Sequence, residues 1–419
     1  MCAFTRNDTG HLVVDGVSLD TIASQFGSPL YVYSGAGIAA AYNDFAAAVA
    51  PVNGKVHYAL KANSALGVIA LLAKHGAGAD IVSGGEMDRA VAAGIDPADI
   101  VFSGVGKSRD EICKALAAGV GQINAESSAE LEMISAAAAE MGVSAPVALR
   151  VNVDVDPGTH AKISTGQRST KFGISTDQQE AADLYKLLHT DPHITPAGLA
   201  VHIGSQITTL DPFERAYSAL LALGNGLRSE GLPVPNLDLG GGVGVDYESA
   251  TPTDFSAYGT MLTKIFKNTG FTLGFEPGRS IVANNGVLLT EIIFIKEGDN
   301  KRFAIVDAAM NDLLRPTLYE AYHSIVTVAP QGAAIGPADI VGPVCETGDY
   351  LGRDRDMPEL KSGDLLAVMS AGAYGAVMSS SYNTRPPAGE VMVLDGVVHQ
   401  LRRQRTVESL LAEEDIPEL

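Results

Sequence analysis

Eight short apolar segments with the character of β-strands lie between residues 56 and 277 of the 419-residue chain. Each one ends in polar residues or glycine and is followed by an Ala- and Leu-rich stretch with helical spacing, such as SALGVIALLAKHG. The expected strands are residues 56–61, 79–83, 100–103, 121–125, 147–152, 199–204, 236–241 and 272–277.

This strand–helix alternation is typical of two parallel α/β architectures, the closed barrel and the doubly wound open sheet. The count of eight favours the barrel, for which about 250 residues are typical. We therefore predict an α/β fold with a (β/α)8 barrel of the TIM type. In such a barrel the chemistry lies at the C-terminal ends of the strands.

A second domain is expected after residue 285, where strands such as VLLTEIIFIKE and EVMVLDGVVHQLRRQ are separated by turns. HLVVDGVSL and PLYVYS, which precede the barrel, are further strand candidates, and we expect them to join the C-terminal strands in one mostly β domain. The predicted domains are residues 1–35 and 284–419 for the β domain and residues 36–283 for the barrel.

Composition restricts the compartment and the partners. Asp and Glu number 49 against 29 Lys and Arg, a net charge of −20 that argues against binding to nucleic acid or to an anionic membrane. The three cysteines form no disulfide framework, and the first residues do not resemble a signal peptide. No apolar stretch is long enough for a membrane span. These features together lead us to expect a cytoplasmic protein. We also expect no metal site, because Cys345 has no second Cys or His at ligand spacing.

Two strand ends carry side chains with both a structural and a chemical interpretation. Lys61 ends the first barrel strand in YALKANS. It either extends its charged head to solvent or supplies a desolvated amine for a Schiff base. His202, in HIGSQ at the end of the sixth strand, is either a hydrogen-bonded core residue or a partner that stacks on a flat cofactor.

Two further strand ends complete a pattern. In LGGGVG, Gly240, Gly241 and Gly242 form either a tight turn or a phosphate-binding loop. In EPGRS, Glu276 and Arg279 either pair with each other or face a cationic ring nitrogen and a ligand carboxylate. Pyridoxal 5'-phosphate needs a Schiff-base lysine, a stacking partner, a phosphate site and a carboxylate at its ring nitrogen, and the four strand ends match all of these needs.

The carboxylate indicates the type of reaction. It keeps the pyridine nitrogen of the cofactor protonated, so that the ring withdraws electrons strongly. Such a ring suits a reaction that generates a full carbanion at Cα, such as the decarboxylation of an amino acid. A basic group at the same place would suit a racemase better.

Seven motifs occur in order in a resemblance that runs from about residue 25 to about residue 400, namely YALKANS, HIGSQ, LGGGVG, EPGRS, DAAMNDLLRPTLY, GPVCETGDYL and GAYG. With them the chain resembles the diaminopimelate decarboxylases. These belong to the barrel-type pyridoxal-phosphate enzymes, together with ornithine and arginine decarboxylases and alanine racemase. The resemblance implies a homodimer that converts meso-2,6-diaminopimelate to L-lysine and carbon dioxide, the last step of lysine biosynthesis.

The resemblance also implies roles for the matching residues. The catalytic residues would be Lys61, which binds the cofactor, His202, which stacks on its ring, and Cys345. The cofactor-binding residues would be Lys61, Asp80, His202, Ser205, Gly240, Gly241, Gly242, Glu276, Gly278, Arg279 and Tyr374. The substrate-binding residues would be Arg279, Arg315, Tyr319, Glu346 and Tyr374.

Cys345 and Glu346 stand side by side in GPVCETGD. In the family this pair reaches into the active site of the neighbouring subunit, where the cysteine returns a proton to Cα and the glutamate pairs with the distal ammonium of the substrate. A thiol pKa of about 8.5 keeps the proton in place at neutral pH, as this duty requires. The structural alternative is a small buried cysteine next to a surface charge.

Three other functions remain as alternatives. A decarboxylase of ornithine, arginine or a carboxylated polyamine shares the fold, but its substrates would not need both Arg315 and Glu346. A cofactor-binding protein without activity would be expected to have lost Lys61 or Cys345. A dinucleotide-dependent oxidoreductase would leave the same two residues without a role.

Two loops remain, one with a motif that fails and one with an open interpretation. SGVGKS (103–108) ends like a phosphate-binding P-loop but has Val101 in place of the first glycine, so we predict no nucleotide site there. Residues 158–170 follow the fifth strand and form either a lid over the barrel mouth or an ordinary surface loop.

Overall fold

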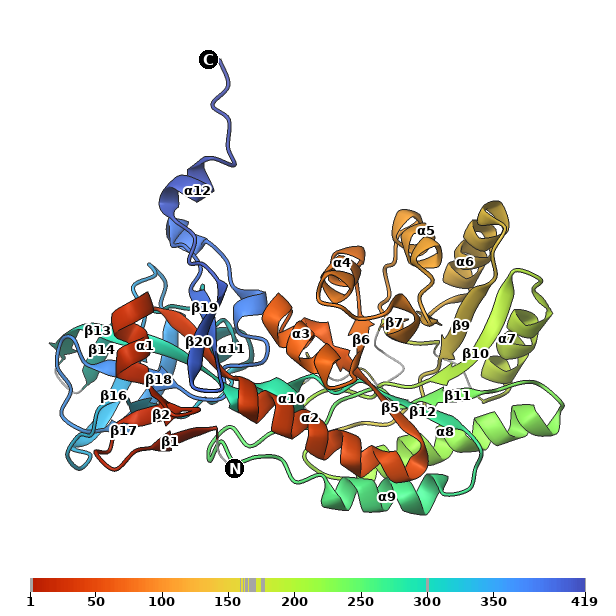
Figure 1. Ribbon diagram of the computed structural model, residues 1–419, viewed down its shortest axis with the longest axis horizontal. Coiled ribbons are helices and arrows are strands. Elements are labelled where there is room, and N and C mark those ends of the chain that lie inside the picture. The colour runs from red at the N-terminus through yellow and green to blue at the C-terminus, as the bar shows by residue number, and fades with distance from the viewer. Residues whose placement is uncertain are drawn as a thin grey trace. The chain divides into compact units, whose positions relative to one another are not determined.

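The computed structural model consists of two compact units (Figure 1). We call Tyr42–Gly244 with Thr253–Gly278 the barrel unit, and Met1–Ala41 with Val245–Pro252 and Arg279–Leu419 the β unit. The structure describes residues 3–158, 160, 162, 165, 171–174, 178–298 and 301–418. Most of the loop 158–170 lies outside the described residues, so neither interpretation of it is tested.

Eight parallel strands close the barrel, as predicted, in the order β10-β11-β12-β5-β6-β7-β8-β9. The last strand along the chain pairs with the first through Leu273 and Gly54, which closes the ring. The strands are β5 (Gly54–Ala59), β6 (Gly78–Ile81), β7 (Ile100–Phe102), β8 (Gln122–Ala125), β9 (Ala145–Arg150), β10 (Ile194–Ala200), β11 (Asn236–Asp238) and β12 (Thr272–Phe275).

Helices surround the strands of the barrel unit (Figure 1). Local sequence sets where they begin and end: the side chain of Ser108 accepts the backbone N–H of Glu111 in a capping box, and Gly119 ends the same helix with φ of 77°. The helices are α2 (Gly35–Val49), which starts in the β unit, α3 (Leu66–Lys74), α4 (Gly84–Ala92), α5 (Arg109–Ala118), α6 (Ser128–Met141), α7 (Gln178–Thr190), α8 (Asp211–Ser229) and α9 (Ser256–Phe266).

Aromatic side chains join the helices to the barrel wall. Phe45 of α2 lies edge-on to Phe255 at 5.1 Å and to Phe275 of β12 at 6.0 Å, measured between ring centroids. The hydroxyls of Tyr217 and Tyr258, both buried, hydrogen-bond to each other at 2.8 Å, which satisfies their polar ends inside an apolar layer.

The main sheet of the β unit is built around β13, whose register pairs Leu288 with Tyr31 of β4 on one side. PLYVYS therefore joins the C-terminal strands, as predicted. The strands of this sheet are β4 (Leu30–Ser34), β13 (Gly286–Glu297), β14 (Arg302–Val306), β15 (Ile325–Thr327), β16 (Gly336–Val341), β17 (Tyr350–Met357), β18 (Leu365–Val368), β19 (Gly389–Leu394) and β20 (Val397–Arg402).

HLVVDGVSL also belongs to the β unit but does not extend the main sheet. Its strands β2 (Leu12–Val14) and β3 (Val17–Ser18) pair with β1 (Phe4–Arg6) in a separate three-stranded sheet. The backbone N–H of Leu12 donates to the carbonyl of Val328 at 2.9 Å, and Val14 shares an apolar cluster with Val287. The remaining helices of this unit are α1 (Leu19–Phe26), α10 (Arg279–Val282), α11 (Arg315–Tyr319) and α12 (Val407–Leu411).

Among the described residues, no helix combines the length and the apolar character that a membrane crossing demands. The same residues hold no group of three or more His, Cys, Asp or Glu side chains arranged to hold a metal ion.

Candidate active site

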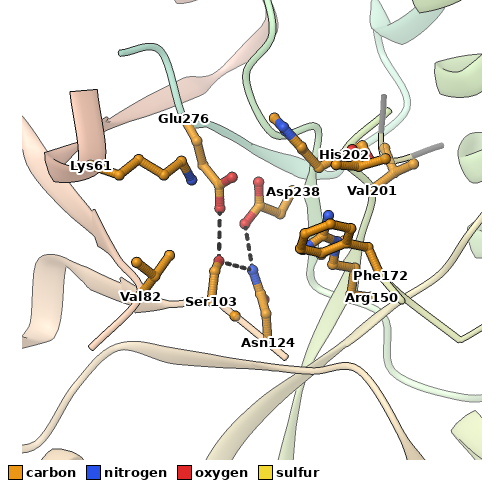
Figure 2. A pocket seen from close by; sticks show the side chains of 13 residues that line it. Lys61, Val82, Ser103, Asn124, Arg150, Phe172, Val201, His202, Asp238 and Glu276 are labelled. Atoms are coloured by element: carbon orange, nitrogen blue, oxygen red, sulfur yellow. Dashed lines mark hydrogen bonds between the residues drawn. The ribbon is translucent and has the colours of Figure 1, made fainter. Parts of the chain in front are cut away.

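A cavity of about 170 Å³ lies at the C-terminal ends of the barrel strands (Figure 2). All eight strands supply lining residues, either from their last positions or from the loops that follow them. This is the end of the barrel at which the fold predicts chemistry. Its polar wall contains Lys61, Ser103, Asn124, Arg150, His202, Asp238 and Glu276.

Lys61 stands two residues after β5, on a short 3-10 turn, Leu60–Ala62. Its Nζ donates to Oδ2 of Asp80 at 2.7 Å, and the side chain is 33% exposed while that of Asp80 is fully buried. The lysine therefore does not simply extend to solvent. The second carboxylate oxygen of Asp80 is buried and has no hydrogen-bond partner in the described part of the chain.

Glu276 follows β12 and is buried, with its carboxylate directed into the cavity (Figure 2). Its Oε1 accepts a hydrogen bond from the hydroxyl of Ser103 at 3.4 Å. Burial raises the pKa of Glu276 well above its usual range, and the negative charges of Asp238 and Asp80 raise it further. A cationic group in the cavity would stabilise the ionised carboxylate.

A chain of neutral side chains holds the two carboxylates of the cavity wall. Ser103 accepts from Nδ2 of Asn124 at 3.0 Å, and Asp238 accepts from Gln122 at 3.0 Å and from Asn124 at 3.4 Å. These residues were not among the predicted site residues. For Ser103 and Asn124 the available signal was their position, because each stands at or near the end of a predicted strand, where Lys61 also stands.

His202 lies two residues after β10 and is half-buried. Its Nδ1 accepts the backbone N–H of Gly241 at 3.2 Å, so the proton of the neutral ring belongs on Nε2. Burial lowers the pKa of His202 well below its usual range, and the charges of Arg150 and Lys61 lower it further. The ring is therefore neutral, which suits a flat partner for an aromatic ligand.

The glycine loop after β11 packs tightly against its neighbours. A Cβ on Gly240 would lie 2.5 Å from the carbonyl oxygen of Val201, and one on Gly241 would lie 2.2 Å from that of Glu276. Gly240 also has φ of 66°, and its N–H donates to Oδ1 of Asp238 at 3.0 Å. Packing thus explains these glycines, and phosphate binding by the loop stays a prediction.

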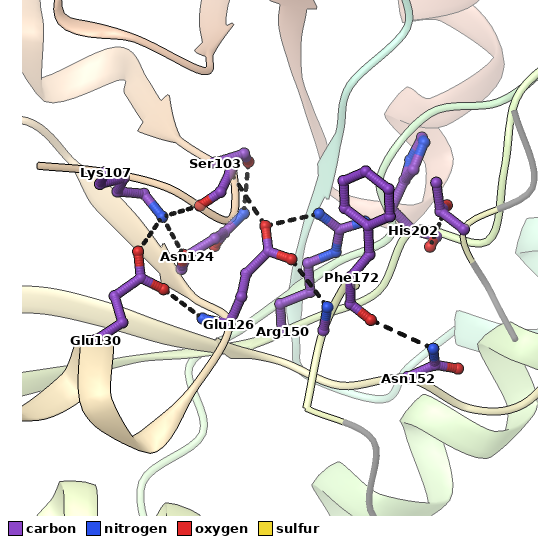
Figure 3. Close-up of polar contacts among 12 residues, drawn as sticks. Ser103, Lys107, Asn124, Glu126, Glu130, Arg150, Asn152, Phe172 and His202 are labelled. Atoms are coloured by element: carbon purple, nitrogen blue, oxygen red, sulfur yellow. Dashed lines mark hydrogen bonds and ion pairs between the residues drawn. The ribbon is translucent and has the colours of Figure 1, made fainter. Parts of the chain in front are cut away.

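Behind the cavity, Lys107 of SGVGKS is buried and fully engaged within the protein (Figure 3). Its Nζ donates to Oε1 of Glu130 at 2.9 Å and to the carbonyls of Gly104 and Asn124, both at 2.7 Å. This lysine has a structural role.

Glu126 connects three parts of the cavity wall (Figure 3). Its Oε1 accepts from Nη1 of Arg150 at 2.8 Å and from the N–H of Gly104 at 3.1 Å, and its Oε2 accepts from the N–H of Gly173 at 2.9 Å. The guanidinium of Arg150 also lies 5.2 Å from the ring centroid of Phe172. Neither charge was among the predicted site residues: Arg150 ends β9 and Glu126 directly follows β8, and neither belongs to a recognised motif.

In the β unit, Arg279 and Arg315 begin the helices α10 and α11, and both are buried. Each donates to the phenol oxygen of Tyr247, at 2.5 Å and 2.8 Å. The guanidinium of Arg279 also lies 4.7 Å from the ring centroid of Tyr374, a predicted site residue. Two buried guanidinium groups held in this way suit an anionic ligand group. Tyr319, at the end of α11, is half-buried.

Cys345 and Glu346 lie in the loop between β16 and β17. Cys345 is exposed, so the alternative of a small buried cysteine is wrong. Its N–H donates to the side chain of Asn383 at 2.9 Å, and a hydrogen bond with Glu346 raises the pKa of the exposed Tyr382. The carboxylate of Asp349 accepts two backbone N–H groups at the base of the loop, which fixes its shape.

The structure divides the remaining predicted site residues between the two units. Ser205 lies in the loop after β10 and is half-buried. Gly278 ends the barrel unit, and a Cβ there would lie 2.9 Å from that of Ala62, the neighbour of Lys61. The barrel unit therefore holds the predicted cofactor-binding residues from Lys61 to Gly278. The β unit holds all the predicted substrate-binding residues. Two of these, Arg279 and Tyr374, are also predicted to bind the cofactor.

Comparisons with known proteins bear on this arrangement. Residues 36–283 match the family model of the pyridoxal-dependent decarboxylases, pyridoxal binding domain. The chain is 51% identical to the diaminopimelate decarboxylase of Pseudomonas aeruginosa and 47% identical to that of Vibrio cholerae, and each match covers 99% of both chains.

Solved structures of diaminopimelate decarboxylases also match this chain. The crystal structure of diaminopimelate decarboxylase from M. jannaschi matches with a TM-score of 0.93 at 35% identity, over 99% of this chain and 98% of that one. The enzyme from Helicobacter pylori complexed with L-lysine matches with a TM-score of 0.90 at 38% identity, over 94% and 98%.

Proposed function

The chain belongs to the diaminopimelate decarboxylases, a group of pyridoxal-dependent decarboxylases, and we propose that it converts meso-2,6-diaminopimelate to L-lysine and carbon dioxide. One observation of the structure carries this proposal: Lys61, His202 and the buried Glu276 share a single cavity at the C-terminal end of the barrel. The sparse cysteines suit a reducing compartment, and we propose that the reaction takes place in the cytoplasm.

The cofactor is pyridoxal 5'-phosphate, and the residues of the cavity fit it. The raised pKa of Glu276 and the unpartnered oxygen of Asp80 mark buried carboxylates that a cationic ligand would stabilise. Lys61 would hold the cofactor through its amine, Glu276 at the ring nitrogen and His202 at the ring face. When bound, the cofactor draws electrons away from Cα of the amino acid, so that the bond to the departing carboxylate weakens.

The protein's own side chains have separate tasks. Asp80 accepts a hydrogen bond from Nζ of Lys61 and so fixes the amine at the cavity wall. Glu276 ionises when a positive charge approaches it, because its burial otherwise favours the neutral acid. His202 stays neutral and is oriented by Gly241, so it adds no charge to the cavity. Cys345 would return a proton to Cα after carbon dioxide leaves.

The part of the substrate that does not react accounts for the two buried arginines. Diaminopimelate carries an ammonium and a carboxylate at the end that does not react. We propose that Arg279, Arg315 and Tyr319 bind this distal carboxylate and that Glu346 pairs with the ammonium. Ornithine and arginine lack a distal carboxylate, so they would leave two buried guanidinium groups without an anion.

We propose that the enzyme is a homodimer whose active sites are shared. The proposal is supported by the exposed position of Cys345 in a loop of fixed shape, since a general acid must reach the reacting atom. Chains carrying Lys61→Ala would be mixed with chains carrying Cys345→Ala, each inactive alone. Partial recovery of activity supports shared sites, and no recovery despite proven exchange of subunits contradicts them.

Product analysis tests the reaction itself. Purified protein with pyridoxal phosphate would be incubated separately with meso-diaminopimelate, L-ornithine, L-arginine and L-lysine, and carbon dioxide and the amine product would be measured. We expect carbon dioxide and L-lysine from diaminopimelate alone. Release from ornithine or arginine instead would overturn the assignment of the distal pocket, and release from none would overturn the proposed reaction.

A further inference from the structure

The phenol oxygen of Tyr247 lies between two guanidinium groups. Nη1 of Arg279 donates to it at 2.5 Å and Nη1 of Arg315 donates to it at 2.8 Å. The two arginines are 7% and 5% exposed. Two like charges are therefore brought together away from solvent, and the neutral oxygen of one tyrosine connects them.

A phenol is suited to this position. Its oxygen has two lone pairs, so it accepts one hydrogen bond from each guanidinium, and its own hydrogen remains available to a further acceptor. A carboxylate at this place would orient the arginines equally well but would neutralise one of them. The tyrosine orients both cations and leaves their charge in place.

The ring of Tyr247 also contacts both arginines through cation–π interactions. The guanidinium carbon of Arg315 lies 4.6 Å from the ring centroid and that of Arg279 lies 6.0 Å from it, both within the range of cation–π attraction. The edge of His323 packs on the same ring at 5.1 Å between centroids. Nδ1 of His323 lies 2.9 Å from the carbonyl of Met369.

His323 contributes no third positive charge to the cluster. Burial lowers the pKa of His323 to about 3, and the charge of Arg315 contributes to this shift. The imidazole is therefore neutral at the pH of a cell. The positive charge of the cluster thus comes from Arg279 and Arg315.

We propose that Tyr247 is a positioning residue for the distal carboxylate of the substrate. It holds the two guanidinium groups side by side, so that they bind one carboxylate as a pair. This inference rests on the proposed function, in which the arginines meet that carboxylate. It adds the residue that keeps the pair together.

The position of Tyr247 in the chain supports the assignment. It stands three residues after Gly244, where the glycine loop of the barrel unit ends, and it belongs to the segment Val245–Pro252 of the β unit. The carboxylate of the neighbouring Asp246 accepts the hydroxyl of Ser249 and the backbone N–H groups of Glu248 and Ser249, so it is engaged within its own turn.

The test removes only the hydroxyl, with Tyr247→Phe. We expect KM for meso-diaminopimelate to rise about tenfold, because both guanidinium groups lose a shared hydrogen-bond acceptor, while kcat stays within about twofold. Binding of L-lysine, which keeps the distal carboxylate, should weaken about tenfold in calorimetry. Binding of cadaverine, which is L-lysine without that carboxylate, should not change.

The matched control is Tyr322→Phe. Tyr322 is an exposed tyrosine of the same unit whose ring faces Arg355 at 3.7 Å, so the chemical change is the same next to a different arginine. The control should alter neither KM nor the binding of L-lysine. Thermal unfolding of both variants shows whether a loss of binding comes from a loss of folded protein.

A double-mutant cycle with Arg315→Gln is a second, independent test. Because Arg315 is one of the two donors to the phenol oxygen, Tyr247→Phe should weaken L-lysine binding less in the Arg315→Gln background than in the wild type. Additive effects would contradict the inference. This comparison uses ratios within each background, so it holds even where the single variant is less stable.

Several outcomes would overturn the inference. An unchanged KM, a fall in kcat alone, or equal weakening of L-lysine and cadaverine would each show that Tyr247 does not act on the carboxylate. If the wild type releases no carbon dioxide from diaminopimelate, the proposed function fails. The calorimetric comparison then still decides on Tyr247, because it needs no turnover, and a wild type that does not bind L-lysine would overturn this inference as well.

Discussion

In the cavity of the barrel unit a carboxyl group accepts a hydrogen bond from a neutral side chain, and in the arginine pair of the β unit two guanidinium groups donate to one. Glu276 is held by the hydroxyl of Ser103, and the two arginines are held by the phenol of Tyr247. In both places a neutral side chain orients a buried ionisable group without acting as its counter-charge. A buried charge held in this way keeps its attraction for a ligand of the opposite sign.

The contrast within the barrel unit is with two ion pairs, one behind the cavity and one in its wall. Lys107 pairs with Glu130, and Arg150 pairs with Glu126. These charges are already compensated by a protein partner, so they contribute to the wall of the site and not to the recognition of a ligand charge. This difference separates groups that a neutral side chain holds from these ion pairs, and it leads to four predictions.

Lys61→Ala should have the largest effect. We expect activity to fall by about 10⁴-fold or more, because the amine that holds the cofactor is lost. The absorbance of the bound cofactor should change as well. The control is Lys114→Ala, an exposed lysine of the same unit that pairs with Asp88. Activity within about tenfold of the wild type would contradict the role of Lys61.

Glu130→Gln should affect stability and leave catalysis almost unchanged. Removing one partner of a buried ion pair costs about 3–5 kcal/mol in the free energy of unfolding, because the ammonium of Lys107 stays buried without its counter-charge. Urea unfolding measures this loss. A large fall in kcat in the folded variant would break the distinction between paired charges and charges held by neutral groups.

Glu276→Gln should lower catalysis and leave stability almost unchanged. The amide keeps the size of the side chain and an acceptor for Ser103 but cannot carry the negative charge. We expect kcat to fall by about 10²-fold, with little change in the free energy of unfolding. The exposed Glu132→Gln on α6 is the matched control. Wild-type kcat in the Glu276 variant would contradict its placement at the ring nitrogen.

His323→Gln should have the smallest effect, visible as a pH dependence. The folded pKa of about 3 lies below the unfolded value of about 6.5, so the unfolded chain binds more protons between these values. Stability conferred by the neutral imidazole is therefore lost as pH falls from 6.5, by about 1.4 kcal/mol for each pH unit. The variant has no imidazole at this position, so it should lose less stability over the same pH range.

Urea unfolding at pH 6.5 and pH 5 gives this slope for the wild type and the variant. We expect the slope of the variant to be lower by nearly one proton. Equal slopes would show that His323 is not held neutral, and the arginine pair would then have a third charge beside it.

The predictable part of the site follows from strand geometry. Lys61, His202 and Glu276 each follow a parallel strand, and the carboxyl ends of parallel strands converge at one end of a barrel. Residues at equivalent positions along the pattern therefore meet in space. Ser103 and Asn124 obeyed the same rule, but their common residue types gave no reason to select them.

The unpredictable part concerns which side chains meet. Ser103 and Glu276 are separated by 173 positions, and Arg315 and Tyr247 by 68. No periodicity connects such pairs, because each contact depends on the direction in which two separate loops leave their strands. For the same reason, nothing in the sequence separates Val245–Pro252 from the barrel or pairs β2 and β3 with β1.

The sequence by itself determined the barrel, the β unit, the cofactor and the residues at the strand ends, because these depend on local periodicity and on the chemistry of single residues. Only the tertiary structure decided which charges are compensated and which are held by neutral groups. That distinction depends on distances of about 3 Å between side chains far apart in the chain, which no local pattern of the sequence reports.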